Sequence, residues 1–470
     1  MPRYELSAKG PPKFWEIHIV GAEYTLREGT VGAVGKETTI TEESHDAALE
    51  AAALLIEGRR RRGYRLVGGT EPTRDPVPEG QPLAPAPVIV ESPPFLPQNP
   101  ALDELIQADP DNPAGYLVYG DWLQTLGHPW GELIAVQHAL ERDPGRAAPG
   151  ALRAIEAGYF DRYRRRLLGD LALRSQVKIT FRLGFIAGAR VDDSREFGAL
   201  AIEDLVRTLQ DLPAARFLSD LSVGPFTIPP GGDYGVPIAR HTSPTRDYGP
   251  LIKLLTSRRV PRALRRLSLG TSALHDNSSV GTGGWPSLGQ VEALSGAFPK
   301  LEELTLQTSG IHLDGIHLPD LRRFELRSAE LPQAAIRAIV AAQWPKLSTL
   351  VLWLGTTPSA GDEQALLAPL LSWLEEGGLP SLRHLGLRCT RTTLALCNAL
   401  ARSRILKQLE GLDLWMGSLT DDGAGALRLQ HAGAFSHLRV FNLENNRLTR
   451  EGCLSLSAGM PSLRLGGQRP

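Results

Sequence analysis

A short apolar pattern, leucine-x-x-leucine-x-leucine, recurs through the C-terminal half of this chain. Six clear copies, two with phenylalanine as the second apolar residue, begin at Leu301, Leu321, Leu347, Leu382, Leu409 and Leu438. A self-similar pattern of this kind predicts a solenoid, in which each repeat buries its apolar residues against its neighbours. Such a chain forms an extended surface more readily than a catalytic cleft, so the pattern favours recognition over catalysis.

The pattern resembles a leucine-rich repeat. Two copies, Leu419-Thr420 and Leu448-Thr449 with the glycines that follow them, resemble its ribonuclease-inhibitor-like subtype. The resemblance implies an α/β horseshoe over residues 177–470, with one short strand per repeat on the concave side. We expect outer helices at residues 333–342, 362–376, 393–402, 421–429 and 450–458, divergent units at 218–223 and 264–269, and a capping strand at 177–183. The loops 224–250 and 270–286 are rich in Gly, Pro and Ser and are candidate binding elements.

Residues 1–68 predict a separate small α+β domain. Residues 14–20 alternate like a strand, residues 38–41 indicate another, and Gly29, Gly32 and Gly35 are expected to mark turns between them. An alanine-rich helix then covers residues 47–56 and leads into the run Arg59, Arg60, Arg61 and Arg62. This layout resembles a WGR domain over residues 13–66.

The signature of that domain is altered here, because Glu28-Gly29-Thr30 stands where the family has Trp-Gly-Arg. The resemblance implies contacts with DNA ends, which in DNA-dependent poly(ADP-ribose) polymerases involve that Trp and Arg. A carboxylate removes the stacking surface and repels phosphate. Over residues 1–68, ten Lys and Arg balance ten Asp and Glu, so we expect no DNA-end binding. The arginines at 59–62 are candidate phosphate contacts, with a solvated helix end as the alternative reading.

Residues 69–98 are dense in proline and predict an extended linker without helix or central strand. Residues 99–176 then predict a small helical domain. Its segments Asp109-Pro110-Asp111, Leu117 to Leu123 (LVYGDWL) and Gly131-Glu132 resemble the bacterial repeat-companion domain, which occurs beside repeat regions and implies no catalytic role. Asp109, Asp121 and Glu132 could be read as a metal cluster, but we expect Asp109 to cap a helix instead.

Composition and motifs argue against an enzyme. The formal net charge is −1, and the three cysteines have no paired spacing, which favours a reducing compartment. The first residues contain no long apolar run, so we expect a cytoplasmic protein without a membrane span. The glycine run 29–35 fails as a phosphate loop because Thr30 and Glu37 stand where glycine and Ser or Thr are required. His312 and His317 lack metal-ligand spacing, and we predict no metal, no cofactor and no catalytic residue.

Side chains that alternate with the leucines are expected to line the concave face of the horseshoe. Their composition, rich in Trp and Arg, is typical of an energetic centre of a protein interface. We therefore predict a protein partner there, bound by Arg323, Arg327, Trp353, His384, Arg388, Asp413, Trp415 and Glu444. The alternative is that the two tryptophans pack on each other or under a loop. The predicted function is a non-enzymatic bacterial adaptor or sensor, and the alternative is a DNA-end-binding regulator that acts through residues 1–68.

Overall fold

The computed structural model describes most of the chain in two compact units that divide near residue 92. The described residues are 2–6, 12–41, 45–61, 63–68, 96–142, 149–193, 200–224, 247–257, 261–270, 285–328, 331–355, 360–431, 433–457 and 462–469. The predicted linker, apart from residues 96–98, and most of both candidate binding loops lie outside these ranges.

The first unit is an antiparallel sheet of five strands in the order β4-β3-β2-β1-β5, with helix α1 (His45–Arg61) packed against one face. The strands are β1 (Arg3–Leu6), β2 (Lys13–Val20), β3 (Glu23–Thr30), β4 (Lys36–Thr41) and β5 (Arg65–Gly68). Its core joins small helix residues to aromatic strand residues and comprises Tyr4, Trp15, Ile17, Tyr24, Ala48, Ala51, Ala52, Ile56 and Tyr64. The predicted strands at 14–20 and 38–41 and the predicted helix are confirmed, whereas β1, β3 and β5 were not foreseen.

The glycines of this unit explain a tight turn between β3 and β4. Gly32 and Gly35 adopt positive φ angles of 94° and 76°, which favour glycine. Gly29 lies inside β3 and not in a turn, which corrects the expectation from sequence. A Cβ atom on Gly29 would lie 2.9 Å from the Cα of Gly35, and one on Gly35 would lie 2.7 Å from the Phe14 ring. Strand, turn and ring can therefore approach this closely only without side chains at these positions.

The second unit is built on a mixed sheet of eleven strands. In order they are β6 (Val177–Arg182), β7 (Phe185–Val191), β8 (Asp220–Val223), β9 (Arg266–Leu269), β11 (Glu303–Thr308), β13 (Arg323–Ser328), β14 (Thr349–Trp353), β15 (His384–Arg388), β16 (Gly411–Asp413), β17 (Val440–Asn442) and β18 (Leu463–Arg464). β6 and β7 pair antiparallel, and every later neighbour is parallel. β10 (Ser287–Gln290) and β12 (Gly310–His312) form a separate parallel pair.

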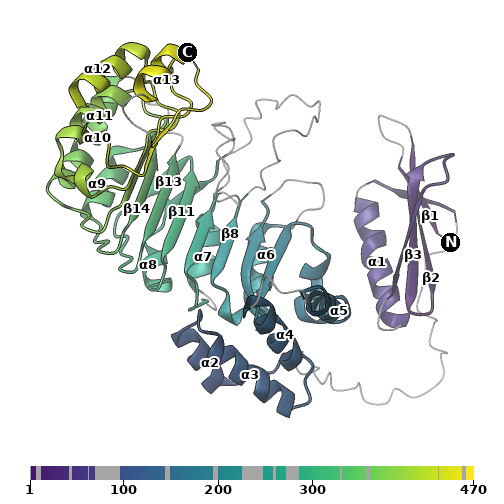
Figure 1. Ribbon diagram of the computed structural model, residues 1–470. Coiled ribbons are helices and arrows are strands. Elements are labelled where there is room, and N and C mark those ends of the chain that lie inside the picture. The colour runs from purple at the N-terminus through teal and green to yellow at the C-terminus, as the bar shows by residue number, and fades with distance from the viewer. Residues whose placement is uncertain are drawn as a thin grey trace, which may run out of the picture. The chain divides into compact units, whose positions relative to one another are not determined.

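Helices connect successive strands of this sheet (Figure 1). They are α6 (Ile202–Asp211), α7 (Gly249–Ser257), α8 (Ala293–Ala297), α9 (Gln333–Ala341), α10 (Ala360–Glu375), α11 (Thr393–Arg402), α12 (Asp421–His431) and α13 (Arg450–Ser457), with the 3-10 turns η2 (Pro213–Phe217) and η3 (Arg404–Gln408). The five predicted outer helices are confirmed as α9 to α13, each within two residues of its expected bounds. The predicted strands at 177–183, 218–223 and 264–269 appear as β6, β8 and β9, while β7, α6, α7 and the β10–β12 pair were not foreseen.

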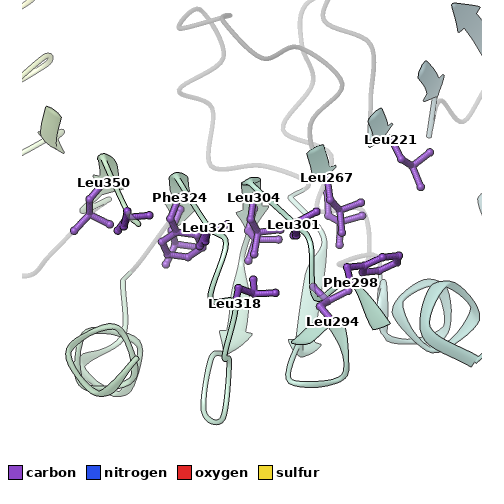
Figure 2. Packing of buried hydrophobic residues seen from close by; sticks show 14 of the residues in the cluster. Leu221, Leu267, Leu294, Phe298, Leu301, Leu304, Leu318, Leu321, Phe324 and Leu350 are labelled. Carbon is purple, nitrogen blue, oxygen red and sulfur yellow. The ribbon is translucent and has the colours of Figure 1, made fainter. Parts of the chain in front are cut away.

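The recurring leucines form the core between the sheet and the helix layer. Figure 2 shows Leu221, Leu267, Leu304, Phe324 and Leu350 extending from successive strands into this layer, and all are buried. Strand pairing places them opposite one another, for example Leu304 beside Phe324 and Phe324 beside Leu350. Because side chains alternate along a strand, the residues between the leucines point to the opposite face. We call that opposite surface the polar face.

A buried asparagine closes the turn after one of the strands. Asn446 Nδ2 donates to the carbonyls of Leu414 and Leu443, both at 3.0 Å, and its Oδ1 accepts from the amide of Leu419 at 2.9 Å. Gly417 makes room for this carboxamide, because a Cβ there would lie 2.4 Å from Asn446 Oδ1. The backbone groups that a bend leaves unpaired are thus satisfied by one side chain.

Residues 97–176 supply helices that pack at the β6 end of the same unit. They are α2 (Pro100–Ala108), α3 (Pro113–Thr125), α4 (Trp130–Arg142), α5 (Pro149–Leu168) and the turn η1 (Gly169–Leu173). The side chains of Asn99 and Asn112 cap α2 and α3, so Asp109 is not the N-cap that the sequence suggested. Asp109 instead ends α2, and its carbonyl accepts from the Asn112 amide.

One arginine joins these helices to the sheet. Arg216 donates to Asp103 at 3.1 Å and to the Tyr119 hydroxyl at 2.8 Å, and its guanidinium lies 5.5 Å from the centre of the Phe185 ring. It also donates to the carbonyls of Leu96 and Pro97. A single, largely buried cation therefore contacts α2, α3, β7 and residues 96–97, and no spacing pattern in the sequence predicts these contacts.

Candidate functional site

The polar face carries parallel rows of side chains, because the strands are paired in register. The inner row is Gln307, Arg327, Trp353, Arg388, Trp415 and Glu444, and the central row is Thr305, Glu325, Val351, Gly386, Asp413 and Asn442. The outer row is Asp220, Arg266, Glu303, Arg323, Thr349, His384, Gly411 and Val440. The edge row borders this face and consists of the residue immediately before each of seven strands: Arg265, Glu302, Arg322, Ser348, Arg383, Glu410 and Arg439. All the partner-binding residues predicted from sequence lie in the inner, central and outer rows.

A buried carboxylate organises the middle of this face. Glu325 is 1% exposed and accepts hydrogen bonds from Arg327 at 2.9 Å and from Arg323 at 2.8 Å. Arg388 approaches it to 3.9 Å and also binds Asp413 at 2.7 Å. Burial alone would raise the pKa of Glu325, but the charges of Arg327, Arg388 and Arg323 outweigh it and hold that pKa below its usual value. The carboxylate therefore stays charged and ties strands β13 and β15 together.

The two tryptophans of the inner row are buried, with exposed fractions of 2% for Trp353 and 5% for Trp415. Their ring centres lie 5.4 Å apart, and with Val351 they form an apolar cluster separate from the main core. The guanidinium groups of Arg327 and Arg388 lie over the Trp353 ring at 5.1 and 5.6 Å. The tryptophans pack on each other, as in the second of the two alternatives, and do not form an exposed contact surface.

The outer and edge rows differ from the inner row in being open. Side-chain exposure reaches 61% for Arg322 and 44% for Arg266. Charges alternate in sign from strand to strand, with the pairs Arg265-Arg266, Glu302-Glu303 and Arg322-Arg323 on successive strands. Ion pairs within the rows vary in closeness: Arg266 lies 2.9 Å from Asp220 and Arg439 lies 3.1 Å from Glu410, whereas Arg265 and Arg322 lie 3.9 and 3.8 Å from Glu302. Sequence reasoning missed this order, although each pair directly precedes a core leucine or phenylalanine of the repeated pattern.

His384 is the accessible titratable ring of the outer row. Gly411 beside it has no side chain, and a Cβ there would lie 2.7 Å from His384 Nδ1, so the ring lies over the glycine. Partial burial lowers the pKa of His384; Glu410 acts to raise it and Arg323 to lower it further, and the net shift is downward. The imidazole is therefore held neutral beside a cation.

A hollow of about 470 Å³ adjoins the polar face at strands β6 to β9. Its charges are largely paired, since Arg182 binds Glu141 at 3.0 Å and Arg266 binds Asp220 at 2.9 Å. Arg182 also donates to the carbonyls of Pro110 and Asp111, so it fastens α3 to the sheet. The charged side chains that line the hollow therefore hold the helices and the sheet together.

The arginine run of the first unit is engaged within that unit where the structure describes it. Arg59 binds Glu28 at 2.6 Å and lies over the rings of Trp15 and Tyr64 at 5.2 and 5.4 Å. The carboxylate at the altered signature thus holds one of the candidate phosphate contacts. Arg60 also interacts within the chain, and the side chains of Arg61 and Arg62 lie outside the described residues.

No group of three or more His, Cys, Asp and Glu side chains among the described residues has metal-binding geometry. Asp121 is exposed, and Glu132 accepts a hydrogen bond from the Tyr159 hydroxyl. The cysteines are free, and burial raises the pKa of Cys397 to about 12, so its thiol stays protonated. Of the helices described, none has the length and apolar character needed to cross a membrane.

Comparisons with known proteins give no family. No family model and no curated protein sequence matches this chain. Among solved structures, the chain is similar to a crystal structure of a Bacteroides fragilis protein, with 16% identity and a TM-score of 0.49. The match covers 100% of this chain and 97% of that chain.

Proposed function

We propose that this chain is a leucine-rich-repeat protein that recognises another protein on the polar face of its second unit and catalyses no reaction. Three features support the proposal: the repeated leucine pattern, the parallel strands that follow it, and the helices that join them. In repeat proteins of this kind, stacked strands present an extended binding surface.

The observation that carries the proposal is the open pair of outer and edge rows. Their charged side chains stand on consecutive strands about 4.8 Å apart, at positions set by backbone pairing. Beside them on the same face, the Glu325 network and the tryptophan pair form a closely packed region that we call the floor. A surface whose charges are already in place loses little conformational entropy on binding.

The buried tryptophans change which predicted residues we expect to touch the partner. Arg323, His384, Arg388, Asp413 and Glu444 retain solvent exposure and are the proposed contacts. Arg327, Trp353 and Trp415 are buried, so we assign them to the supporting floor.

A capture experiment with two matched variants tests the proposal. Thr349→Arg places a bulky side chain between Arg323 and His384 on the polar face, and Leu429→Arg places the same side chain on α12, where Leu429 is 78% exposed. Proteins retained by the full-length chain from a bacterial lysate are identified by mass spectrometry. We expect one partner to be lost with Thr349→Arg and kept with Leu429→Arg; a partner that both variants retain equally would place recognition on another surface.

We further propose that the first unit is a WGR-like domain with a protein-contact role. The engagement of Arg59 by Glu28 supports this proposal, because it removes one cation from reach of phosphate. Submicromolar binding of the full-length chain to duplex ends at physiological salt, lost when Arg59 and Arg60 are changed to Gln, would contradict it.

A further inference from the structure

One stretch of the outer and edge rows is basic, with Glu325 of β13 pairing with one of its cations, Arg323. It spans β13, β14 and β15, and we call it the arginine patch. Its members are Arg322, Arg323, Ser348, Thr349, Arg383 and His384. All six are exposed or half-buried, and backbone pairing places them side by side.

The contacts within the patch leave part of its guanidinium donors available. Arg383 donates to the carbonyls of Pro380 and Leu382, and the described residues place no carboxylate against it. Arg322 has only the 3.8 Å approach to Glu302, and Arg323 shares Glu325 with Arg327. The middle strand contributes no charge: the Ser348 hydroxyl donates to the Arg322 carbonyl at 3.0 Å, and Thr349 adds a second hydroxyl.

Acidic residues limit the patch on both sides. Glu302 and Glu303 precede it at the start of β11, and Glu410 follows it before β16. The patch is therefore three strands wide, which corresponds to about 10 Å between its outer strands.

We infer that the arginine patch binds a short acidic segment of the partner protein, in which two or three carboxylates lie close together. The inference rests on the proposed function and names the chemistry of its partner. Guanidinium groups bind carboxylates through paired, charge-assisted hydrogen bonds, and the Thr349 hydroxyl between them adds a donor for the same oxygens. A nucleic acid fits less well, because its continuous line of phosphates would meet Glu302, Glu303 and Glu410 beyond the patch.

His384 gives this binding a pH dependence. Toward its ring the outer and edge rows present Arg323, Thr349, Arg383, Glu410 and Gly411. A carboxylate bound beside the ring favours its protonated form, so the complex should take up a proton. Affinity for the acidic segment should therefore rise as the pH falls from 7.5 to 5.5.

The test uses the full-length chain and a fluorescently labelled peptide that contains three adjacent glutamates. The same peptide with glutamines is its control, and anisotropy at low ionic strength measures the dissociation constant. Arg383→Gln should weaken binding about tenfold, since it removes a charge-assisted hydrogen bond. Arg439→Gln removes another charge of the edge row, outside the patch, which is 79% exposed and pairs with Glu410 at 3.1 Å, and it should change affinity less than about twofold.

Several outcomes would overturn the inference. Equal loss in Arg383→Gln and Arg439→Gln would mean diffuse charge attraction, and equal binding of the glutamine peptide would mean that carboxylates are not recognised. Tighter binding of a single-stranded oligonucleotide of matched charge would assign the face to nucleic acid. If the peptide does not bind while capture of a partner is still lost in Thr349→Arg, the acidic segment is rejected and the proposed function stands.

In His384→Gln the rise in peptide affinity at pH 5.5 should disappear. Persistence of that rise would exclude a role of this ring in the pH dependence.

Discussion

The inner and outer rows of the polar face are four residues apart along the chain, yet the middle of the inner row is largely buried while most of the outer row is exposed or half-buried. Trp353 and Thr349 share β14, but the tryptophan is 2% exposed and packs on Trp415, whereas the threonine keeps contact with solvent. The difference arises from side-chain size. Long inner-row side chains lie over one another, as Arg388 does over Trp353, while short or charged outer-row side chains project from the edge.

The comparison shows that the face of a strand and the exposure of its residues are separate properties. Alternation along β14 assigns Thr349, Val351 and Trp353 to the same face. Exposure then depends on which neighbours in the next strands are large enough to cover them. Rows on the same face of the sheet can therefore serve either as floor or as contact surface.

The largest effect should come from truncating the floor. Trp353→Ala removes a buried ring that contacts Trp415 and two guanidinium groups, and we expect a loss of about 3–5 kcal/mol in the free energy of unfolding. Thr349→Ala on the same strand should cost less than about 0.5 kcal/mol. Urea unfolding followed by circular dichroism measures both. Similar small losses in the two variants would show that the tryptophan is not part of a stabilising cluster.

The second effect concerns charge in the central and outer rows. Glu325→Gln leaves Arg327 and Arg388 without their buried counter-charge, and breaking such a pair costs about 3 kcal/mol. Glu303→Gln, one strand away in the outer row, should cost less than about 0.5 kcal/mol, because half-exposed charges are screened by solvent. Denaturant midpoints give the two values. A loss of unfolding free energy at Glu303 as large as that at Glu325 would mean that the two rows do not differ in the energetic effect of burial.

Much of the second unit can be predicted from its sequence, because the leucine pattern reports directly on burial. Leu304, Leu350 and Leu385 were assigned to the core and are buried, and the outer helices follow each strand as the pattern requires. β7 was missed because its Phe185-Ile186 start does not match the leucine spacing. Arg216 was missed because its partners come from α2, α3 and residues 96–97, which only the tertiary structure brings together.

The candidate site was predictable only in part, and for a related reason. The columns of residues between the leucines were identified correctly as one face, and the register confirms their order. Their exposure was not predictable, because it depends on contacts between strands. The Arg-Arg, Glu-Glu and Arg-Arg pairs before three successive strands were visible in the sequence and would have directed attention to the edge.

A third prediction separates the rows by their response to acid. The pKa of Glu325 is lower in the folded chain than its ordinary value, so the folded state binds fewer protons than the unfolded state in the acidic range. The stabilisation by Glu325 is therefore complete above the unfolded pKa, near 4.3, and is lost as the pH falls through the lower folded value. The difference in unfolding free energy between the parent chain and Glu325→Gln should shrink as the pH falls from 6 to 3. A difference that stays constant would mean that Glu325 does not titrate with unfolding.

The smallest effect should come from His384 in the open row. Its folded pKa is also lowered, so the neutral ring is favoured and the stabilisation is complete above the unfolded pKa, near 6.5. As the pH falls through the folded pKa the unfolded state binds the extra proton, and stability declines. Because the ring is solvent-exposed, we expect the decline to stay under about 0.5 kcal/mol. Unfolding at pH 7.5 and pH 5 should show this decline in the parent chain and a reduced one in His384→Gln. If His384→Gln shows the same decline in unfolding free energy as the parent chain, the decline comes from other groups. A decline in the parent well above about 0.5 kcal/mol would mean that this ring is less exposed than the rest of its row.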